Sequence, residues 1–504
     1  MAENIDHNHS SDGPDVGHSP VSKLCDDLMR LIVNLSVEVH DQPVNNCGRC
    51  RNTPGALADV RTCRARPWVL TAMVRLSHVS QHWRAVVLDD RFLWARHVEI
   101  TPHTSSSNLS ELVKRAKGLP LHVYFDIHGV QLPDILSWPQ IVQIFSRCIF
   151  MHFCAESGSR FLPLVLITPA PILEECEIAC GTPGHALAYW RPLFHGEAPK
   201  LKTLRIIRLC TPLVQEDSQA YLGGVSMTTL QSLEELTALR SLEFTFPTTQ
   251  PQGDRRLLQM DNAKPIPLVG LKELRLTGEP FSVSYFLTKT ALPNVTHFSI
   301  TYTLTNDPIW ASTDIIWRSL SLVFPAQTFM TLTIECNPLF QRFRLQHSDG
   351  RLLTLRFCGR GVTGLDPDFQ SDVATFVGLP ETSATARFQI VHGCVWLSML
   401  FTKPKFMESI STVRVTSTPS NPVNRTFPHH VLFLFRLLRS VNTLRLEDIE
   451  SSTNLEWYEL LEKVLTRRNH LKAICVPSST RETAVFSSDA PNLPKSISDI
   501  ISFF

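Results

Sequence analysis

Charge imbalance, long apolar runs and catalytic motifs are all scarce in this chain of 504 residues. Its 48 Lys and Arg residues nearly balance 47 Asp and Glu residues, so a net charge of +1 gives no global attraction to nucleic acid or to a membrane. No apolar run approaches the roughly 18 residues of a membrane-spanning helix, and even VLFLFRLL is interrupted by Arg436. We therefore expect a soluble protein that binds neither nucleic acid nor membrane.

The beginning of the chain lacks the basic-then-apolar order of a secretion signal. Residues 1–20 are instead polar and rich in Asp, His and Ser, which is typical of a disordered tail. The expected location is therefore the cytoplasm, the nucleus or both.

Recognisable catalytic motifs are also missing. No G-x-S-x-G, H-E-x-x-H or G-x-x-x-x-G-K-[ST] pattern occurs, and the 19 histidines are scattered along the chain. We expect no enzymatic activity and no cofactor.

The 13 cysteines are odd in number and irregularly spaced, which favours reduced and mostly buried thiols over a disulfide framework. One cluster, Cys47, Cys50 and Cys63, could bind zinc if His40 or Cys25 supplied a fourth ligand. A second ligand pair is missing, so a flexible cysteine-bearing loop is favoured and no metal site is expected. A zinc-dependent nucleic-acid binder remains a disfavoured alternative.

Two amphipathic segments predict a small helical module over residues 21–100. In the first, SKLCDDLMRLIVNL, helical spacing predicts one apolar stripe, with Ser22 as the expected N-cap and acidic residues in the first turn. This stripe comprises Leu24, Leu28, Leu31, Ile32 and Leu35. Periodicity disappears over about 36–67, which predicts a loop insertion.

The second segment begins near Leu70 and continues its apolar stripe through Leu76, Val79 and Trp83. The sequence DDRFLWARHVEI then predicts a turn, a short helix carrying Trp94 and a strand at HVEI. So small a module buries two indoles and two stripes only in part. The tryptophans are therefore interpreted either as core residues or as part of a docking surface.

An irregular L-x-x-L-x-L frame occupies residues 101–504. Copies begin at Leu201, Leu239, Leu271, Val295, Phe329, Leu352, Ile410, Val441 and Leu471, with a weaker copy at Leu173. Their starts lie between 23 and 58 residues apart, which indicates a degenerate leucine-rich-repeat solenoid and not a regular one. Each L-x-L predicts a strand whose middle residue faces a continuous concave sheet.

The middle positions of these strands are rich in arginine. They are Arg205, Glu243, Arg275, Ser299, Thr333, Arg356, Arg414, Arg445 and Cys475. If the strands stack in register, the five arginines form a basic row that suits an acidic or phosphorylated protein segment. An ordinary solvated strand face is the alternative interpretation.

The helical module resembles the F-box. LCDDLMRLIV is similar to the first F-box helix, with Leu24, Leu28, Met29 and Ile32 at its apolar positions and Asp27 in place of Glu. RLSHVSQHWRAVVLDDRFLW is similar to the second half, whose matching residues are Val79, Ser80, Trp83, Arg84, Leu93 and Trp94. The combination with irregular leucine-rich repeats is similar to a large fungal family of F-box-like proteins.

This resemblance implies a substrate receptor of a cullin-RING ubiquitin ligase. The F-box would bind the SKP linker protein, and through it a cullin, by way of Leu24, Leu28, Ile32, Leu76, Val79, Trp83 and Trp94. The repeats would hold an unknown protein substrate by way of Arg205, Arg275, Arg356, Arg414 and Arg445. The expected fold is α+β and multi-domain: an F-box-like module followed by an irregular α/β solenoid. The alternative is a leucine-rich-repeat scaffold with a vestigial F-box and no ligase role.

Overall fold

The computed structural model describes seventeen strands and several helices, and the statements below concern the described residues. The described ranges are 25–40, 69–101, 104–127, 137–155, 167–180, 193–207, 227–246, 264–304, 320–321, 323–324, 329–337, 340–359, 409–417, 440–447, 473–476 and 501–503. The predicted tail at 1–20 and the cysteine cluster at 47–63 lie outside them.

The described helices fall into an N-terminal group and a group that alternates with strands. The first group is α1 (Asp26–His40), α3 (Val69–Ser77), α4 (Gln81–Asp89) and α5 (Arg91–Arg96). The second group is α6 (Ser106–Arg115), α7 (Trp138–Phe145), α9 (Met227–Glu235) and α11 (Pro280–Lys289), together with the 3-10 turn η3 (Leu193–Gly196).

Fifteen described strands form one sheet, in the order β1-β2-β3-β4-β5-β6-β8-β10-β13-β12-β11-β14-β15-β16-β17. Their bounds, in chain order, are β1 Val98–Ile100, β2 Leu121–Ile127, β3 Cys148–Ala155, β4 Glu175–Cys180, β5 Thr203–Ile207, β6 Ser241–Thr245, β8 Glu273–Gly278, β10 His297–Leu304, β11 Phe329–Asn337, β12 Phe340–His347, β13 Leu352–Gly359, β14 Thr412–Ser417, β15 Thr443–Glu447, β16 Ala473–Val476 and β17 Ile501–Phe503. A separate small sheet pairs β7 (Ile266–Pro267) with β9 (Thr290–Ala291).

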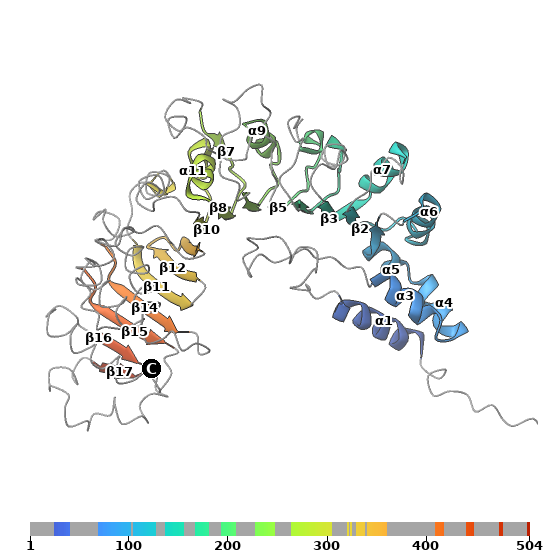
Figure 1. Cartoon of the computed structure of the whole chain (residues 1–504), viewed down its shortest axis with the longest axis horizontal. Coiled ribbons are helices and arrows are strands. Elements are labelled where there is room, and N and C mark those ends of the chain that lie inside the picture. The colour runs from blue at the N-terminus through green and yellow to red at the C-terminus, as the bar shows by residue number, and fades with distance from the viewer. Residues whose placement is uncertain are drawn as a thin grey trace, which may run out of the picture.

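The large sheet bends into an arc, with strands along its inner side and α6, α7, α9 and α11 along its outer side (Figure 1). All of its strand pairs are parallel except those that β12 makes. The prediction of an α+β protein is confirmed, and every predicted L-x-x-L-x-L frame contains or adjoins a strand of this sheet.

Alternation within each strand separates a core face from an inner face. In β8, Leu274 and Leu276 are buried whereas Arg275 between them is exposed. The apolar residues meet the outer helices: Phe286 of α11 lies 6.2 Å from Phe244 of β6, measured between ring centroids. Burial of apolar area at about 25 cal/mol per Å² holds the helices to the sheet, and the polar positions are left on the inner side.

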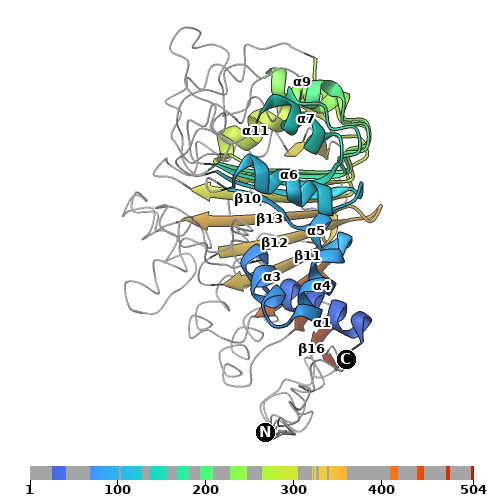
Figure 2. The same cartoon turned by 90° about the vertical axis from the view of Figure 1, so that its right-hand side faces the viewer.

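The order of the strands departs from the expected sequence order at one place. β13 pairs with β10, β11 pairs with β14, and β12 lies antiparallel between β11 and β13. Figure 2 shows β10, β13, β12 and β11 in this spatial order. A tight turn joins β12 to β13, where Gly350 has φ +89 and the Asp349 carboxylate accepts a hydrogen bond from the Arg351 backbone N–H at 3.0 Å. That hydrogen bond, first among several, lowers the pKa of Asp349 to about 2.

In the second half of the helical module, α3, α4, α5 and β1 form as predicted. In the first half, the bounds of α1 differ from the prediction. α1 begins at Asp26 and continues to His40, so the prediction of Ser22 as N-cap and of a loop from about residue 36 is wrong at both ends. The acidic residues Asp26 and Asp27 do occupy the first turn, where their negative charge interacts favourably with the helix dipole. Ser80 caps α4 by accepting a hydrogen bond from the Trp83 N–H at 3.2 Å.

Five cysteines whose side chains the structure describes agree with the expectation of reduced, mostly buried thiols. Cys148, Cys154 and Cys176 are buried, Cys475 is half-buried and Cys25 is exposed, and all five are free. Burial raises the pKa of the Cys148 and Cys176 thiols far above its usual range. Thiolates are the reactive form, so these two positions should be inert.

We expect iodoacetamide to alkylate Cys25 in the native protein and to leave Cys148, Cys154 and Cys176 unmodified. Peptide mass mapping after a short pulse at pH 8 measures this, with the urea-unfolded chain as the control in which all four react. Equal alkylation of Cys25 and Cys176 in the native protein would contradict the burial described here.

Within the described ranges, no helix is both long enough and apolar enough to cross a bilayer.

Candidate protein-binding surfaces

Both tryptophans of the helical module lie in its core. Trp83 is 5% exposed and Trp94 is 6% exposed. They pack with Met29, Val33, Met73, Val86, Val87, Leu93 and Leu112, and Ile32 and Leu76 cover the edge of this cluster. The Trp94 indole N–H donates to the Val87 carbonyl at 2.8 Å, which satisfies its polar end. The two indoles shape the module from inside and do not form its outer surface.

Helix α1 is apolar on two faces. Met29 and Val33, at 0% and 1% exposure, point into the core. Leu28, Leu31 and Leu35, at 41%, 53% and 51% exposure, repeat at spacings of three and four on the other face. The predicted apolar stripe therefore exists, but it is mainly the outward face, and the core contacts are made by residues beside it.

Exposed apolar side chains concentrate in this module. Of the ten large hydrophobic residues that are exposed in the described part of the chain, seven belong to residues 25–100. Besides the three leucines of α1 they are Val74, Val79, Leu88 and Phe92. Scattered single residues of this kind are normal, but such a concentration on a small module makes its surface a candidate for binding another protein.

The predicted docking residues thus separate into two groups. Leu28 and Val79 are exposed, whereas Ile32, Leu76, Trp83 and Trp94 belong to or border the core. Leu24 lies outside the described residues. Leu31 and Leu35 were noted in the stripe but not selected, because periodicity reports that residues share a face and not whether that face is covered.

The module is fixed to the beginning of the sheet by α6. Leu112 of α6 belongs to the module's core cluster, and the Arg115 guanidinium lies 5.2 Å from the Trp94 ring centroid. The Lys117 ammonium, just after α6, contacts the Asp89 carboxylate at 2.8 Å. That contact lowers the pKa of the exposed Asp89, chiefly through the hydrogen bond. Shared core packing is what makes two units move as one body.

The second candidate surface is the inner face of the sheet, where one line of paired residues crosses the strands. From β1 onward the line reads Glu99, Tyr124, His152, Glu177, Arg205, Glu243, Arg275, Ser299, Thr354, Arg344, Thr333, Arg414, Arg445, Cys475 and Ser502. We call it the central row. Residues that pair across strands face the same side of a sheet, so the row lines the inside of the arc.

The first part of the central row is buried and internally paired. His152 and Glu177 are 2% and 4% exposed, and the His152 Nδ1 lies 3.7 Å from the Glu177 carboxylate. Tyr124, 6% exposed, packs against Phe150 in a tilted arrangement with ring centroids 5.5 Å apart. These side chains pack against one another, so this part of the central row is a packed surface.

Arg205 lies between two carboxylates. Its guanidinium contacts Glu177 at 3.5 Å and Glu243 at 3.2 Å. Both acids are on strands next to that of Arg205. The two negative charges outweigh the single positive charge of Arg205, so the local charge is negative. The predicted basic row is therefore an alternation of acid and base in this part of the sheet, as far as Arg275.

The later part of the central row has a different character. From Ser299 to Cys475 it contains Arg344, Arg414 and Arg445, three hydroxyl-bearing residues and no acid. Arg344 is exposed, and Arg414 and Arg445 are half-buried. The Nε of Arg414 is buried and has no hydrogen-bond partner among the described residues. Guanidinium N–H groups beside hydroxyls suit carboxylate or phosphate oxygens.

The position predicted for Arg356 is wrong. Thr354 pairs with Ser299 in the central row, and Arg356 pairs with Thr301, two residues further along β13. Arg344 of β12 takes the place in the row, and it was missed although Phe343-Arg344-Leu345 has the apolar spacing of the other frames. The alternating FRLQH followed by an Asp-Gly turn is the signal of a hairpin that would have revealed it.

A zinc site is not present among the residues that the structure describes. The predicted alternative rested on Cys47, Cys50 and Cys63, all outside those residues, so it stays a prediction. Comparison of the sequence with protein-family models and with curated proteins finds no match.

Proposed function

We propose that this chain is a substrate-recognition adaptor of an SKP-cullin-F-box type ubiquitin ligase, acting in the cytoplasm or nucleus without catalytic groups of its own. The helical module binds the SKP linker protein, and the inner face of the sheet, an irregular leucine-rich-repeat array, holds the substrate. The observation that carries this proposal is the second apolar face of α1, because Leu28, Leu31 and Leu35 stay 41% to 53% exposed beside a completed core.

The arrangement of the two surfaces suits an adaptor. The module and the sheet share the Leu112 and Trp94 packing through α6, so a protein on one surface keeps a defined position relative to the other. Such an adaptor accelerates ubiquitin transfer by raising the effective concentration of a substrate lysine near the charged enzyme. This needs rigid attachment at both ends and no nucleophile in the adaptor.

The test is co-purification of the full chain with an SKP linker protein, followed by calorimetric titration of the purified pair. We expect a one-to-one complex, with affinity that does not weaken much in added salt because the α1 face is apolar. Failure of the folded chain to bind would overturn the adaptor role, and the chain would then be a scaffold with a vestigial F-box.

For the substrate, we propose an acidic or phosphorylated segment bound along Arg344, Arg414 and Arg445. Adjacent strands are about 4.8 Å apart, so Arg414 and Arg445 on neighbouring strands can share one anionic group. Arg344 lies two strands from Arg414, so it can bind a second anionic group of the same segment. Arg205 is not part of this surface, because Glu177 and Glu243 flank it.

We expect the double change Arg344→Glu, Arg414→Glu to weaken binding of a fluorescent phosphoserine peptide at least tenfold, since each charge-assisted hydrogen bond contributes about 1.5–3 kcal/mol. Fluorescence anisotropy measures this. The matched control is Arg240→Glu, Lys264→Glu, which makes the same charge change at exposed positions outside the row. An equal loss in both variants would show only long-range charge effects and would contradict the assigned surface.

A further inference from the structure

The gap between α6 and α7 forms a pocket on the outer side of the arc, away from both surfaces assigned above. Its volume is about 360 Å³, and it is lined by Leu109, Ser110, Val113, Lys114, Gly118, Gln140, Gln143, Ile144 and Arg147. Pockets that hold small molecules measure about 300–1,000 Å³. The size therefore suits a small ligand.

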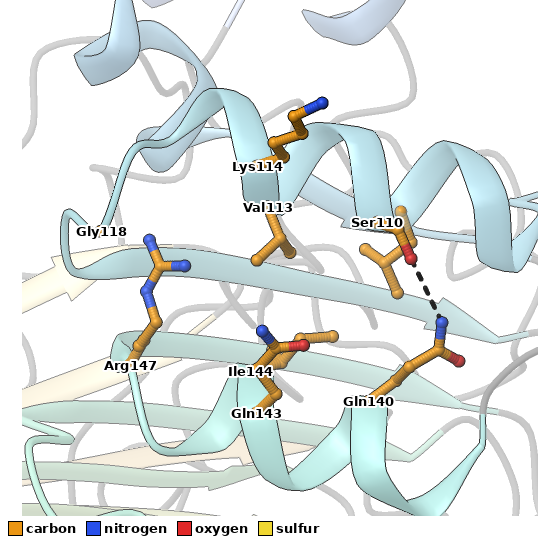
Figure 3. Close-up of a pocket in the computed structure, with 9 residues that line it drawn as sticks. Ser110, Val113, Lys114, Gly118, Gln140, Gln143, Ile144 and Arg147 are labelled. Carbon is orange, nitrogen blue, oxygen red and sulfur yellow. Dashed lines mark hydrogen bonds between the residues drawn. The ribbon is translucent and has the colours of Figure 1, made fainter.

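The floor of the pocket is apolar. Leu109 and Val113 of α6 and Ile144 of α7 are buried, and Figure 3 shows Val113 and Ile144 facing each other across the gap. One end is closed by Gln140, whose amide N–H groups donate to Ser106 at 2.5 Å and to Ser110 at 3.3 Å. Its carbonyl oxygen accepts from the Ser137 backbone N–H at 3.0 Å, so this amide is fixed in place.

The other end of the pocket is cationic. The Arg147 guanidinium donates to the Leu119 carbonyl at 2.8 Å, while its Nε is buried and has no hydrogen-bond partner within the described ranges. Burial lowers the pKa of Arg147, because desolvation disfavours the charged form. None of the lining residues named above is acidic, so the pocket itself offers this cation no counter-charge.

The mouth of the pocket lies beside the turn that follows α6. Lys117 and Gly118 both have positive φ there, and a Cβ on Gly118 would meet no atom within 4 Å. The Lys114 ammonium is at the outer rim and points away from Arg147 (Figure 3). It therefore adds a favourable potential for an anion without contacting the same group.

We propose that this pocket binds a small amphipathic carboxylate, with its apolar tail between Val113 and Ile144 and its carboxylate on the Arg147 guanidinium. An apolar floor with one cationic end is complementary to a molecule with one anionic end. The site is independent of the adaptor role, because neither the α1 face nor the central row contributes to it.

Octanoate is the probe, and octanol is its neutral counterpart, both titrated calorimetrically into the full wild-type chain. We expect octanoate to bind at least tenfold more tightly than octanol, because only octanoate compensates the partly buried guanidinium of Arg147. Methyl resonances of Val113 and Ile144 should shift in the same titration, which places the ligand between the two helices.

Two variants separate the roles of the cations. Arg147→Gln should reduce octanoate affinity about tenfold or more and leave octanol affinity unchanged, whereas Lys114→Gln should reduce octanoate affinity only about twofold, as expected of a screened exposed charge. Equal binding of octanoate and octanol to the wild type, or binding without a shift at Ile144, would overturn the proposal. The comparison of octanoate with octanol on the wild-type chain needs no variant, so it tests the proposal even if Arg147→Gln fails to fold.

Discussion

Replacing Leu31 and Leu35 together by Asp should abolish binding of the SKP linker protein while leaving the chain folded. Both side chains are more than half exposed, so the change removes little core packing. In the complex, however, two carboxylates would be buried against an apolar partner, and an unpaired buried charge costs several kcal/mol. We expect at least a hundredfold loss of affinity, measured by calorimetry.

The matched control for this experiment is Val269→Asp, Met330→Asp. These residues are 58% and 51% exposed and lie outside the helical module, so the double change adds the same charge to equally exposed apolar positions. We expect the control to bind normally, and both variants to keep wild-type thermal stability, as surface changes usually do. Undiminished binding by the α1 variant would remove the α1 face from the docking surface.

Truncating Trp94 to Ala should loosen the whole helical module. The side chain is 6% exposed, its indole N–H bonds to the Val87 carbonyl, and Arg115 lies over its ring. Such buried aromatic truncations cost about 3–5 kcal/mol. Hydrogen exchange followed by mass spectrometry should show amides of residues 81–96 exchanging at least a hundredfold faster. The truncation lowers the free energy of local opening by that amount, so the open state is more populated.

Phe92→Ala is the comparison for Trp94→Ala on the same short helix. Phe92 is 56% exposed, so its truncation should change exchange of residues 81–96 by less than about threefold. The Trp94 variant should also speed exchange in α6, which shares the core through Leu112. Protection of α6 that is unaffected in that variant would mean that the module and the sheet are not packed as one body.

Strands could be predicted from the sequence because their signal is local. In LKELRL polar and apolar residues alternate over residues 273–276, and that alternation selects a pleated strand with Leu274 and Leu276 inward. The strand order could not be predicted from the same frames. Pairing of β13 with β10 depends on the turn at Asp349 and Gly350, and on β12, which has the apolar spacing of the repeat but runs antiparallel to its neighbours.

The candidate surfaces show the same limit. Helical spacing placed Leu28, Leu31 and Leu35 on one face, but only the packing of α3 and α4 against Met29 and Val33 decides which face of α1 stays open. Four arginines of the central row, Arg205, Arg275, Arg414 and Arg445, were similarly visible in the sequence. Their charge balance was not, because Glu177 reaches Arg205 only through pairing of β4 with β5.

The reversed order of β11, β12 and β13 has a consequence for synthesis on the ribosome. A regular array grows by adding each new strand to the edge left by the previous one, so nascent chain is covered as it emerges. Here the edge of β10 stays open while residues 305–351 are made, because its partner is β13. β11 and β12 therefore emerge before the strand that joins them to the sheet. An unpaired edge invites pairing with other chains, so we expect the nascent protein to need a chaperone during this interval.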